Sequence, residues 1–145
     1  MRCFIKAMRE YALFEGRSGR REFWSFLVGF VLFGLLSVWL DRVTGSYNFR
    51  TGVAVFASFW FFGFVLPWMA VSVRRLHDTG RRGIWLAPGL FAVGYLYILS
   101  MPAAQERLLP FWPLAALAGA GYLALMMLPG EPGENAYGPP EQPWC

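Results

Sequence analysis

Charged side chains are scarce in this chain of 145 residues. Asp, Glu, Lys and Arg together make up 15% of it, whereas about 25% is usual for a soluble domain. Apolar residues account for 57% of the chain and aromatic residues for 19%. This composition excludes an ordinary water-exposed surface. It indicates that most of the surface faces something other than water.

Metal ligands and nucleophile motifs are equally scarce. The chain has one histidine, His77, and two cysteines, which lie at opposite ends of the sequence. Zinc sites need several nearby nitrogen or sulfur ligands and haem needs axial ligands, so neither is expected here. The sequence has neither a glycine-rich phosphate loop nor a G-x-S-x-G motif. We therefore expect no metal and no cofactor, and we expect no nucleic-acid partner.

Four stretches contain no charged residue and no histidine, and they span residues 23–40, 53–73, 84–101 and 108–128. An α-helix rises about 1.5 Å per residue, so roughly 20 residues cross a hydrocarbon core about 30 Å thick. A backbone in lipid must satisfy its own hydrogen bonds, which favours helices. Helices of a soluble bundle would need polar faces, which these stretches lack. We predict an all-α membrane protein, one domain of four transmembrane helices over residues 1–145.

The two ends of the chain differ in character. In "MRCFIKAMREYALF" the apolar residues recur at helical spacing and charged residues fall between them. This pattern is typical of a short amphipathic helix that lies in the membrane interface. The tail after Leu128, "PGEPGENAYGPPEQPWC", is too rich in proline and glycine for a helix or a strand. It is expected to be irregular, either disordered or laid across one face as a strap.

Basic residues predict the orientation in the membrane. Ten of the thirteen Lys and Arg residues precede the first stretch or lie between the second and third stretches, and three lie in the other two connections. Short segments rich in Lys and Arg remain in the cytoplasm. We therefore predict that both termini are cytoplasmic.

The segment "RRLHDTGRRG", residues 74–83, is predicted to be the cytoplasmic connection between the second and third helices. Its basic residues fix topology and contact anionic headgroups, an interaction worth about 1 kcal/mol each near the surface. Within it, "HDTG" is typical of a turn in which Asp78 is the first residue and Gly80 has a positive φ.

Three segments carry a resemblance to a known family: "FEGRSGRREFW" (14–24), "RRLHDTGRRG" (74–83) and "GENAYGP" (133–139). They resemble, in the same order, the motifs of a family of small bacterial inner-membrane proteins, domain of unknown function 805. The resemblance implies a multi-pass protein of the bacterial inner membrane with four spans. It implies no particular reaction.

All three motifs fall on the predicted cytoplasmic face, so we expect them to form one polar cluster. The residues best suited to contact an anion are Arg17, Arg20, Arg21, Arg74 and Arg75. The other expected members are Glu22, Trp24, His77, Asp78, Gly80, Asn135 and Tyr137. Glu22 and Asp78 are expected to hold the arginines in place, with Arg74 and Arg20 as the candidate partners of Asp78.

This cluster predicts an integral membrane protein that binds an anionic lipid headgroup or an acidic partner, as a monomer, a homo-oligomer or with a membrane protein partner. One alternative is a membrane-embedded enzyme that acts on a lipid, with His77 as acid–base catalyst and Asp78 beside it. However, adjacent residues of a helix do not face one another. Another alternative is a small oligomeric channel or transporter. Such proteins carry ionisable groups inside their spans, and these four stretches have none.

Overall fold

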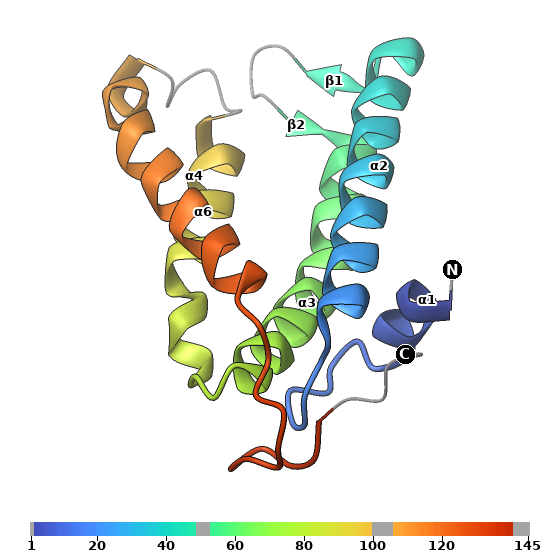
Figure 1. Ribbon diagram of the computed structural model, residues 1–145. Coiled ribbons are helices and arrows are strands. Elements are labelled where there is room, and N and C mark those ends of the chain that lie inside the picture. The colour runs from blue at the N-terminus through green and yellow to red at the C-terminus, as the bar shows by residue number, and fades with distance from the viewer. Residues whose placement is uncertain (1, 49–52, 100–105, 141–145) are drawn as a thin grey trace.

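The computed structural model describes residues 2–48, 53–99 and 106–140. Helices dominate these ranges (Figure 1). The α-helices are α1 (Arg2–Arg9), α2 (Arg20–Thr44), α3 (Val55–Asp78), α4 (Ala87–Leu99) and α6 (Trp112–Met127). Two short 3-10 helices, η1 (Gly83–Leu86) and η2 (Leu109–Phe111), precede α4 and α6. A small antiparallel hairpin of β1 (Tyr47–Asn48) and β2 (Val53–Ala54) connects α2 to α3.

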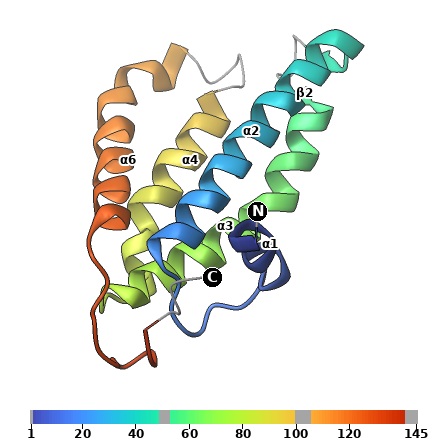
Figure 2. The same cartoon turned by 45° about the vertical axis from the view of Figure 1, so that its right-hand side comes forward.

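The long helices form two pairs that converge at one end. α2 packs along α3, and α4 packs along α6, as both views show (Figures 1 and 2). The pairs meet at the lower end of Figure 1, which also carries α1 and the tail. We call this the polar end: α1, residues 10–24 and 74–86, and the tail residues 128–140.

Three helices of the described chain are long and apolar enough to cross a membrane: Arg20–Thr44, Val55–Asp78 and Glu106–Met127. A fourth apolar helix, Gly83–Leu99, is shorter. The helix that corresponds to the second stretch, residues 53–73, has different bounds from it at both ends. Val53 and Ala54 belong to the hairpin, and α3 continues through Arg74 and Arg75 to Asp78. The connection to the next helix is therefore much shorter than residues 74–83.

Close packing within each pair depends on glycine. The indole of Trp60 on α3 donates a hydrogen bond to the Phe30 carbonyl of α2 at 3.0 Å. A Cβ at Gly34 would lie 2.7 Å from that indole ring. Likewise, a Cβ at Gly89 of α4 would lie 2.7 Å from the ring of Tyr122 on α6. Because lipid is as apolar as these side chains, such close packing is the main source of helix association in a membrane.

The two pairs are joined near the polar end by an aromatic and polar contact. Tyr122 of α6 packs edge-on against Trp68 of α3 and Phe23 of α2, with ring centroids 5.8 and 6.2 Å apart. Its hydroxyl lies 2.7 Å from the Ser72 hydroxyl of α3. All four side chains are buried. This contact fixes the end of α6 against α2 and α3.

The N-terminal helix packs on the bundle. Phe4 lies against Gly29 of α2, where a Cβ would be 2.5 Å from its ring, and its ring is 5.8 Å from that of Phe26. Ala7 is buried. One side of α1 therefore contacts α2, while Arg2, Ile5 and Arg9 remain exposed.

A buried carboxylate supports the opposite end of the bundle. Asp41, in the last turn of α2, accepts hydrogen bonds from the backbone N–H groups of Phe56 and Ala57 at 3.0 and 2.8 Å. These groups lie in the first turn of α3, where backbone donors have no partner within the helix. Asp41 thus supplies, from a neighbouring helix, the cap that the N-terminus of α3 lacks.

Candidate functional site

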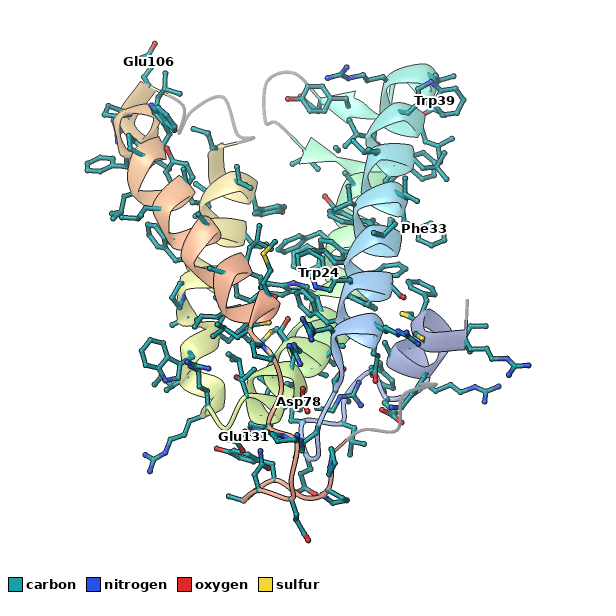
Figure 3. All side chains as sticks on the ribbon, in the orientation of Figure 1. Trp24, Phe33, Trp39, Asp78, Glu106 and Glu131 are labelled. Atoms are coloured by element: carbon teal, nitrogen blue, oxygen red, sulfur yellow. The ribbon has the colours of Figure 1, made fainter. Side chains whose placement is uncertain are left out.

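The polar end brings together side chains from all three sequence motifs. Figure 3 shows Asp78 and Glu131 at this end, among charged side chains from α1, α2, α3 and the tail. Two groups of ion pairs can be distinguished here, one centred on Asp78 and one on Glu22.

Asp78 is bound by two arginines, and neither is a partner that the sequence indicated. Its Oδ1 lies 2.8 Å from Nη2 and 2.9 Å from Nε of Arg17. Its Oδ2 accepts from Nη1 of Arg75, one turn earlier on α3. The expected partners, Arg74 and Arg20, do not fill this role: Arg74 binds glutamates, and the Arg20 side chain is exposed. Arg17, Arg75 and Asp78 are all buried.

Arg75 also joins the end of α3 to the end of α6. Its Nε donates to the Met126 carbonyl at 3.2 Å, and its Nη2 donates to the Leu128 carbonyl. The last carbonyls of a helix have no partner inside the helix and carry partial negative charge. The Arg75 guanidinium therefore acts as the cap of α6 while it neutralises Asp78.

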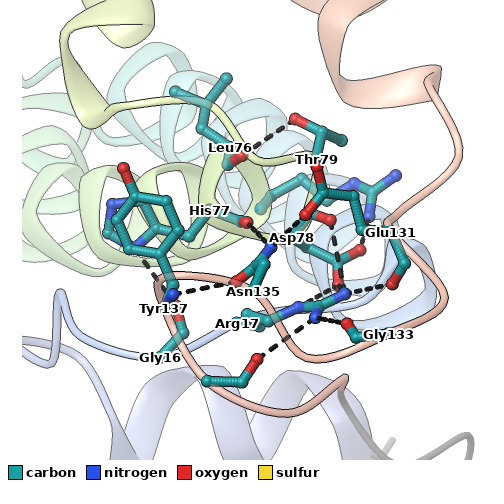
Figure 4. A network of polar contacts seen from close by, with 12 residues as sticks. Gly16, Arg17, Leu76, His77, Asp78, Thr79, Glu131, Gly133, Asn135 and Tyr137 are labelled. Atoms are coloured by element: carbon teal, nitrogen blue, oxygen red, sulfur yellow. Dashed lines mark hydrogen bonds and ion pairs between the residues drawn. The ribbon is translucent and has the colours of Figure 1, made fainter.

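Arg17 holds the tail (Figure 4). Its Nη1 donates to the carbonyls of Gly133 and Gly138 at 2.6 and 3.3 Å, and its Nη2 donates to the Glu131 carbonyl. The backbone N–H of Glu131 donates to the Asp78 carbonyl at 2.8 Å. One buried guanidinium thus connects the segment before α2, the end of α3 and the tail.

The second group is centred on Glu22, at the start of α2. Its Oε1 accepts from Nη2 of Arg74 at 2.8 Å, and its Oε2 accepts from Nζ of Lys6 at 3.0 Å. Arg74 also pairs with Glu10 through Nη1. Glu22 and Arg74 are buried. Lys6 and Glu10 were not expected at this site, because the amphipathic pattern assigned both residues to the wet face of the N-terminal helix.

His77 and the tail residues Asn135 and Tyr137 make a separate set of contacts. The His77 and Tyr137 rings are stacked, with centroids 3.8 Å apart and an interplanar angle of 3°. Asn135 Nδ2 donates to the His77 carbonyl at 3.0 Å, and its Oδ1 accepts from the Tyr137 N–H. His77 Nδ1 lies 3.2 Å from the Gly16 carbonyl, so Nδ1 carries the hydrogen. The imidazole and the Asp78 carboxylate thus bind different groups rather than each other.

The turn after α3 has the predicted conformation at its glycine. Gly80 has a φ of +71°, and its N–H donates to the His77 carbonyl at 3.0 Å. Asp78, however, is the last residue of α3 rather than the first residue of an isolated turn. The tail approaches this turn closely, because a Cβ at Gly130 would lie 2.0 Å from Oδ2 of Asp78.

The other three predicted site residues lie at the surface of the polar end or against its apolar core. Arg20 and Arg21 are exposed in the first turn of α2. Trp24 packs against the apolar core, with its ring 5.3 Å from that of Phe23. The residues that join the buried ion pairs are therefore Arg17, Arg74 and Arg75, together with Glu22 and Asp78.

The chain is similar to a known protein family and to several proteins of Escherichia coli. The model of the family described as "Protein of unknown function (DUF805)" matches residues 11–139. Inner membrane protein YhaH of Escherichia coli K12 is 30% identical over 142 residues, which cover 96% of this chain and 95% of YhaH. Inner membrane protein YhaI of the same strain is 29% identical over 86 residues, 59% of this chain and 68% of YhaI.

A third relative, Uncharacterized protein YiiR of Escherichia coli K12, is 30% identical over 133 residues, 86% of this chain and 83% of YiiR. No solved structure shows a significant match. The matched range contains all three motifs, and with them Arg17, Glu22, Arg74, Arg75, Asp78 and the tail. The chain belongs to the DUF805 family of membrane proteins of unknown function.

Proposed function

We propose that this protein is a four-span protein of the bacterial inner membrane, with both termini cytoplasmic, whose polar end binds anionic lipid headgroups. Three helices have the length and composition of spans. Relatives that cover most of the chain are named inner membrane proteins. The shorter apolar helix Gly83–Leu99 pairs with α6 along its length and is the fourth span of the proposal.

The proposal assigns headgroup contact to the exposed arginines rather than to the buried ones. Arg17, Arg74 and Arg75 are buried, and each already binds a carboxylate. Five other arginines are exposed: Arg2, Arg9, Arg20, Arg21 and Arg82. They lie on α1, at the start of α2 and just before η1, which all belong to the polar end. The presence of exposed arginines at the same end as the buried ion pairs is the observation that carries the proposal.

The proposal is tested by measuring which lipids the protein retains in nanodiscs. We expect native mass spectrometry to show more phosphatidylglycerol than phosphatidylcholine retained by the protein from an equimolar mixture. Arg20→Gln combined with Arg82→Gln should lower this enrichment, because each headgroup contact contributes about 1 kcal/mol. Arg42→Gln is the matched control, since Arg42 is also exposed but lies at the opposite end of α2. Equal retention of both lipids, or an equal effect of Arg42→Gln, would contradict the proposal.

The enzymatic alternative gains no support from the geometry around His77. The contacts described for its side chain are the Gly16 carbonyl and the Tyr137 ring. The Gly16 carbonyl orients the imidazole through Nδ1, as a polar group orients a general base, so this hydrogen bond does not separate the two roles. The Tyr137 ring covers one face of the imidazole. The neighbouring carboxylate, that of Asp78, forms ion pairs with Arg17 and Arg75. We therefore interpret His77 as an attachment point of the tail.

A further inference from the structure

The N-terminal helix α1 has two different sides. Its inner side packs on α2, through the ring of Phe4 and through Ala7, which is fully buried. Its outer side carries Arg2, Ile5 and Arg9, and all three side chains are exposed. Residues three or four positions apart are neighbours on the surface of a helix, so these three form one row along α1. We call Arg2, Ile5 and Arg9 the outer stripe.

Contacts on the inner side determine the direction in which the outer stripe faces. Phe4 lies against Gly29 of α2, where a Cβ would be 2.5 Å from its ring. Nζ of Lys6 forms an ion pair with Oε2 of Glu22, also on α2, at 3.0 Å. An apolar contact and an ion pair to the same helix resist rotation of α1 about its own axis. The outer stripe is therefore held facing away from α2.

The helix on which α1 packs is long and apolar enough to cross a membrane, and α1 lies beside its first turns (Figures 1 and 2). Gly29 lies within the uncharged stretch 23–40. The Phe4 ring is also 6.1 Å from that of Phe33, whose side chain is 46% exposed. In a helix that spans the membrane, exposed apolar side chains of this kind face lipid. The contacts of Phe4 thus attach α1 at the edge of a lipid-facing surface.

The outer stripe combines one apolar side chain with two cations. Ile5 is 49% exposed, and contact of an aliphatic side chain with water is unfavourable. α1 contains no Asp or Glu, and the next carboxylate along the chain, that of Glu10, binds Arg74. Apolar and basic residues on one face are typical of a helix at the membrane interface, where the apolar group reaches the acyl chains and the cations remain among headgroups. The guanidinium of arginine binds two oxygens of a phosphate at once.

We infer that the outer stripe lies in the phosphate layer of the cytoplasmic leaflet, with Ile5 at the ends of the acyl chains and with Arg2 and Arg9 on lipid phosphates. The inference deepens the proposed function and rests on it for the position of α2 across the membrane. It assigns the contact to the phosphate group, which neutral and anionic phospholipids share. The contact of α1 with lipid therefore does not depend on a preference for anionic lipids.

The depth of the outer stripe is measured with a nitroxide spin label on Ile5→Cys. The full-length protein, with Cys3 and Cys145 replaced by serine, is placed in phosphatidylcholine nanodiscs. Collisions of the label with oxygen, which concentrates in lipid, are compared with collisions with a water-soluble nickel chelate. Ala136→Cys is the matched control, because Ala136 is also exposed but lies in the tail. We expect the ratio of oxygen to nickel collisions to be at least about threefold higher at position 5 than at position 136.

The phosphate contact is measured with Arg2→Gln combined with Arg9→Gln. Both side chains are exposed, so the inner side of α1 stays intact. From an equimolar mixture of phosphatidylcholine and a digalactosyl lipid, which has no phosphate, native mass spectrometry should show phosphatidylcholine preferentially retained by the wild type. The double substitution should lower this preference by at least about fivefold, the effect of one contact worth about 1 kcal/mol. Arg42→Gln, at the opposite end of α2, should leave it unchanged.

The inference is overturned if the nickel chelate reaches position 5 as readily as position 136, because the outer stripe then lies in water. It is also overturned if both reagents are excluded and labels at position 5 broaden each other's spectra, because a second copy then covers the stripe. An unchanged lipid ratio in the Arg2 and Arg9 variant would remove the phosphate contact. The proposed function fails separately, if phosphatidylglycerol is not preferred over phosphatidylcholine. A protein without that preference whose outer stripe meets both expectations would refute the proposed function and support the inference.

Discussion

Arg17 and Asp78 are 61 positions apart in the sequence, and their side chains meet with 2.8 Å between Nη2 and Oδ1. This pair closes the polar end, because Arg17 precedes α2 and also binds the tail while Asp78 ends α3. Three separate motifs of the sequence are therefore parts of one structural unit. The arginines buried in it hold the ends of α3 and α6 and the tail, whereas Arg20 and Arg82 are exposed at the same end.

Orientation in the membrane is tested by single cysteines in a background in which Cys3 and Cys145 are replaced by serine. Gly45 lies at the end of α2 opposite the polar end, and Thr79 lies in the turn after α3. We expect a membrane-impermeant thiol reagent to label cysteine at position 45 in intact spheroplasts and to leave position 79 unlabelled until the cells are lysed. Labelling of position 79 from outside would reverse the proposed topology.

The turn at Gly80 should resist substitution. Its φ of +71° is disfavoured for any residue with a Cβ, and that Cβ would lie 2.3 Å from Oε1 of Glu131. Gly80→Ala is expected to reduce the free energy of unfolding by about 1–2 kcal/mol. Gly121→Ala is the matched control, because Gly121 lies within α6 and a Cβ there would meet nothing within 4 Å. Equal losses in the two variants would remove the conformational argument.

The contact between Tyr122 and Ser72 should contribute to the joining of the helix pairs. Tyr122→Phe keeps the ring packing and removes the hydroxyl that lies 2.7 Å from Ser72. Hydrogen bonds between transmembrane helices are worth about 0.5–2 kcal/mol, and a loss in this range is expected on unfolding in detergent. Ser37→Ala is the control, since the Ser37 hydroxyl binds the Phe33 carbonyl of its own helix. A double variant of Tyr122 and Ser72 should lose less than the sum of the single losses.

The helical segments could be predicted from the sequence because they depend on composition over a window of about 20 residues. The lack of charge in 23–40 and 108–128 is a local property, and the helices α2 and α6 lie within or around these stretches. The positive φ of Gly80 could also be predicted from neighbouring residues, because the segment HDTG is typical of a turn.

The end of α3 could not be predicted in this way. A run of charged residues normally marks the end of a span, yet α3 continues through Arg74 and Arg75 because glutamates and Asp78 neutralise them. This compensation comes from Glu10 just after α1, from Glu22 of α2 and from Asp78 of the same helix, and sequence spacing contains no information about the first two. The choice of Arg17 as the partner of Asp78 likewise depends on how the helix ends are brought together.

The role of the N-terminal helix was missed for a related reason. The amphipathic pattern assigns Lys6 to a wet face, but Lys6 reaches Glu22, which is fully buried. One carboxylate oxygen of Glu22 accepts a hydrogen bond from Arg74, and the other accepts one from Lys6 of α1. An isolated helix pattern cannot indicate such a partner.

The central claim is that the three motifs form one buried, mutually dependent network, and a double-mutant cycle between Arg17 and Asp78 in lipid nanodiscs tests it most directly. Each of Arg17→Gln and Asp78→Asn should lower the free energy of unfolding by about 3–5 kcal/mol, because each leaves a buried charge without its partner. The double variant should lose less than the sum by at least about 1 kcal/mol, while Glu134→Gln, at an exposed tail position, should lose almost nothing. Strict additivity, with each single loss below about 1 kcal/mol, is the result for a solvated loop and would contradict the account.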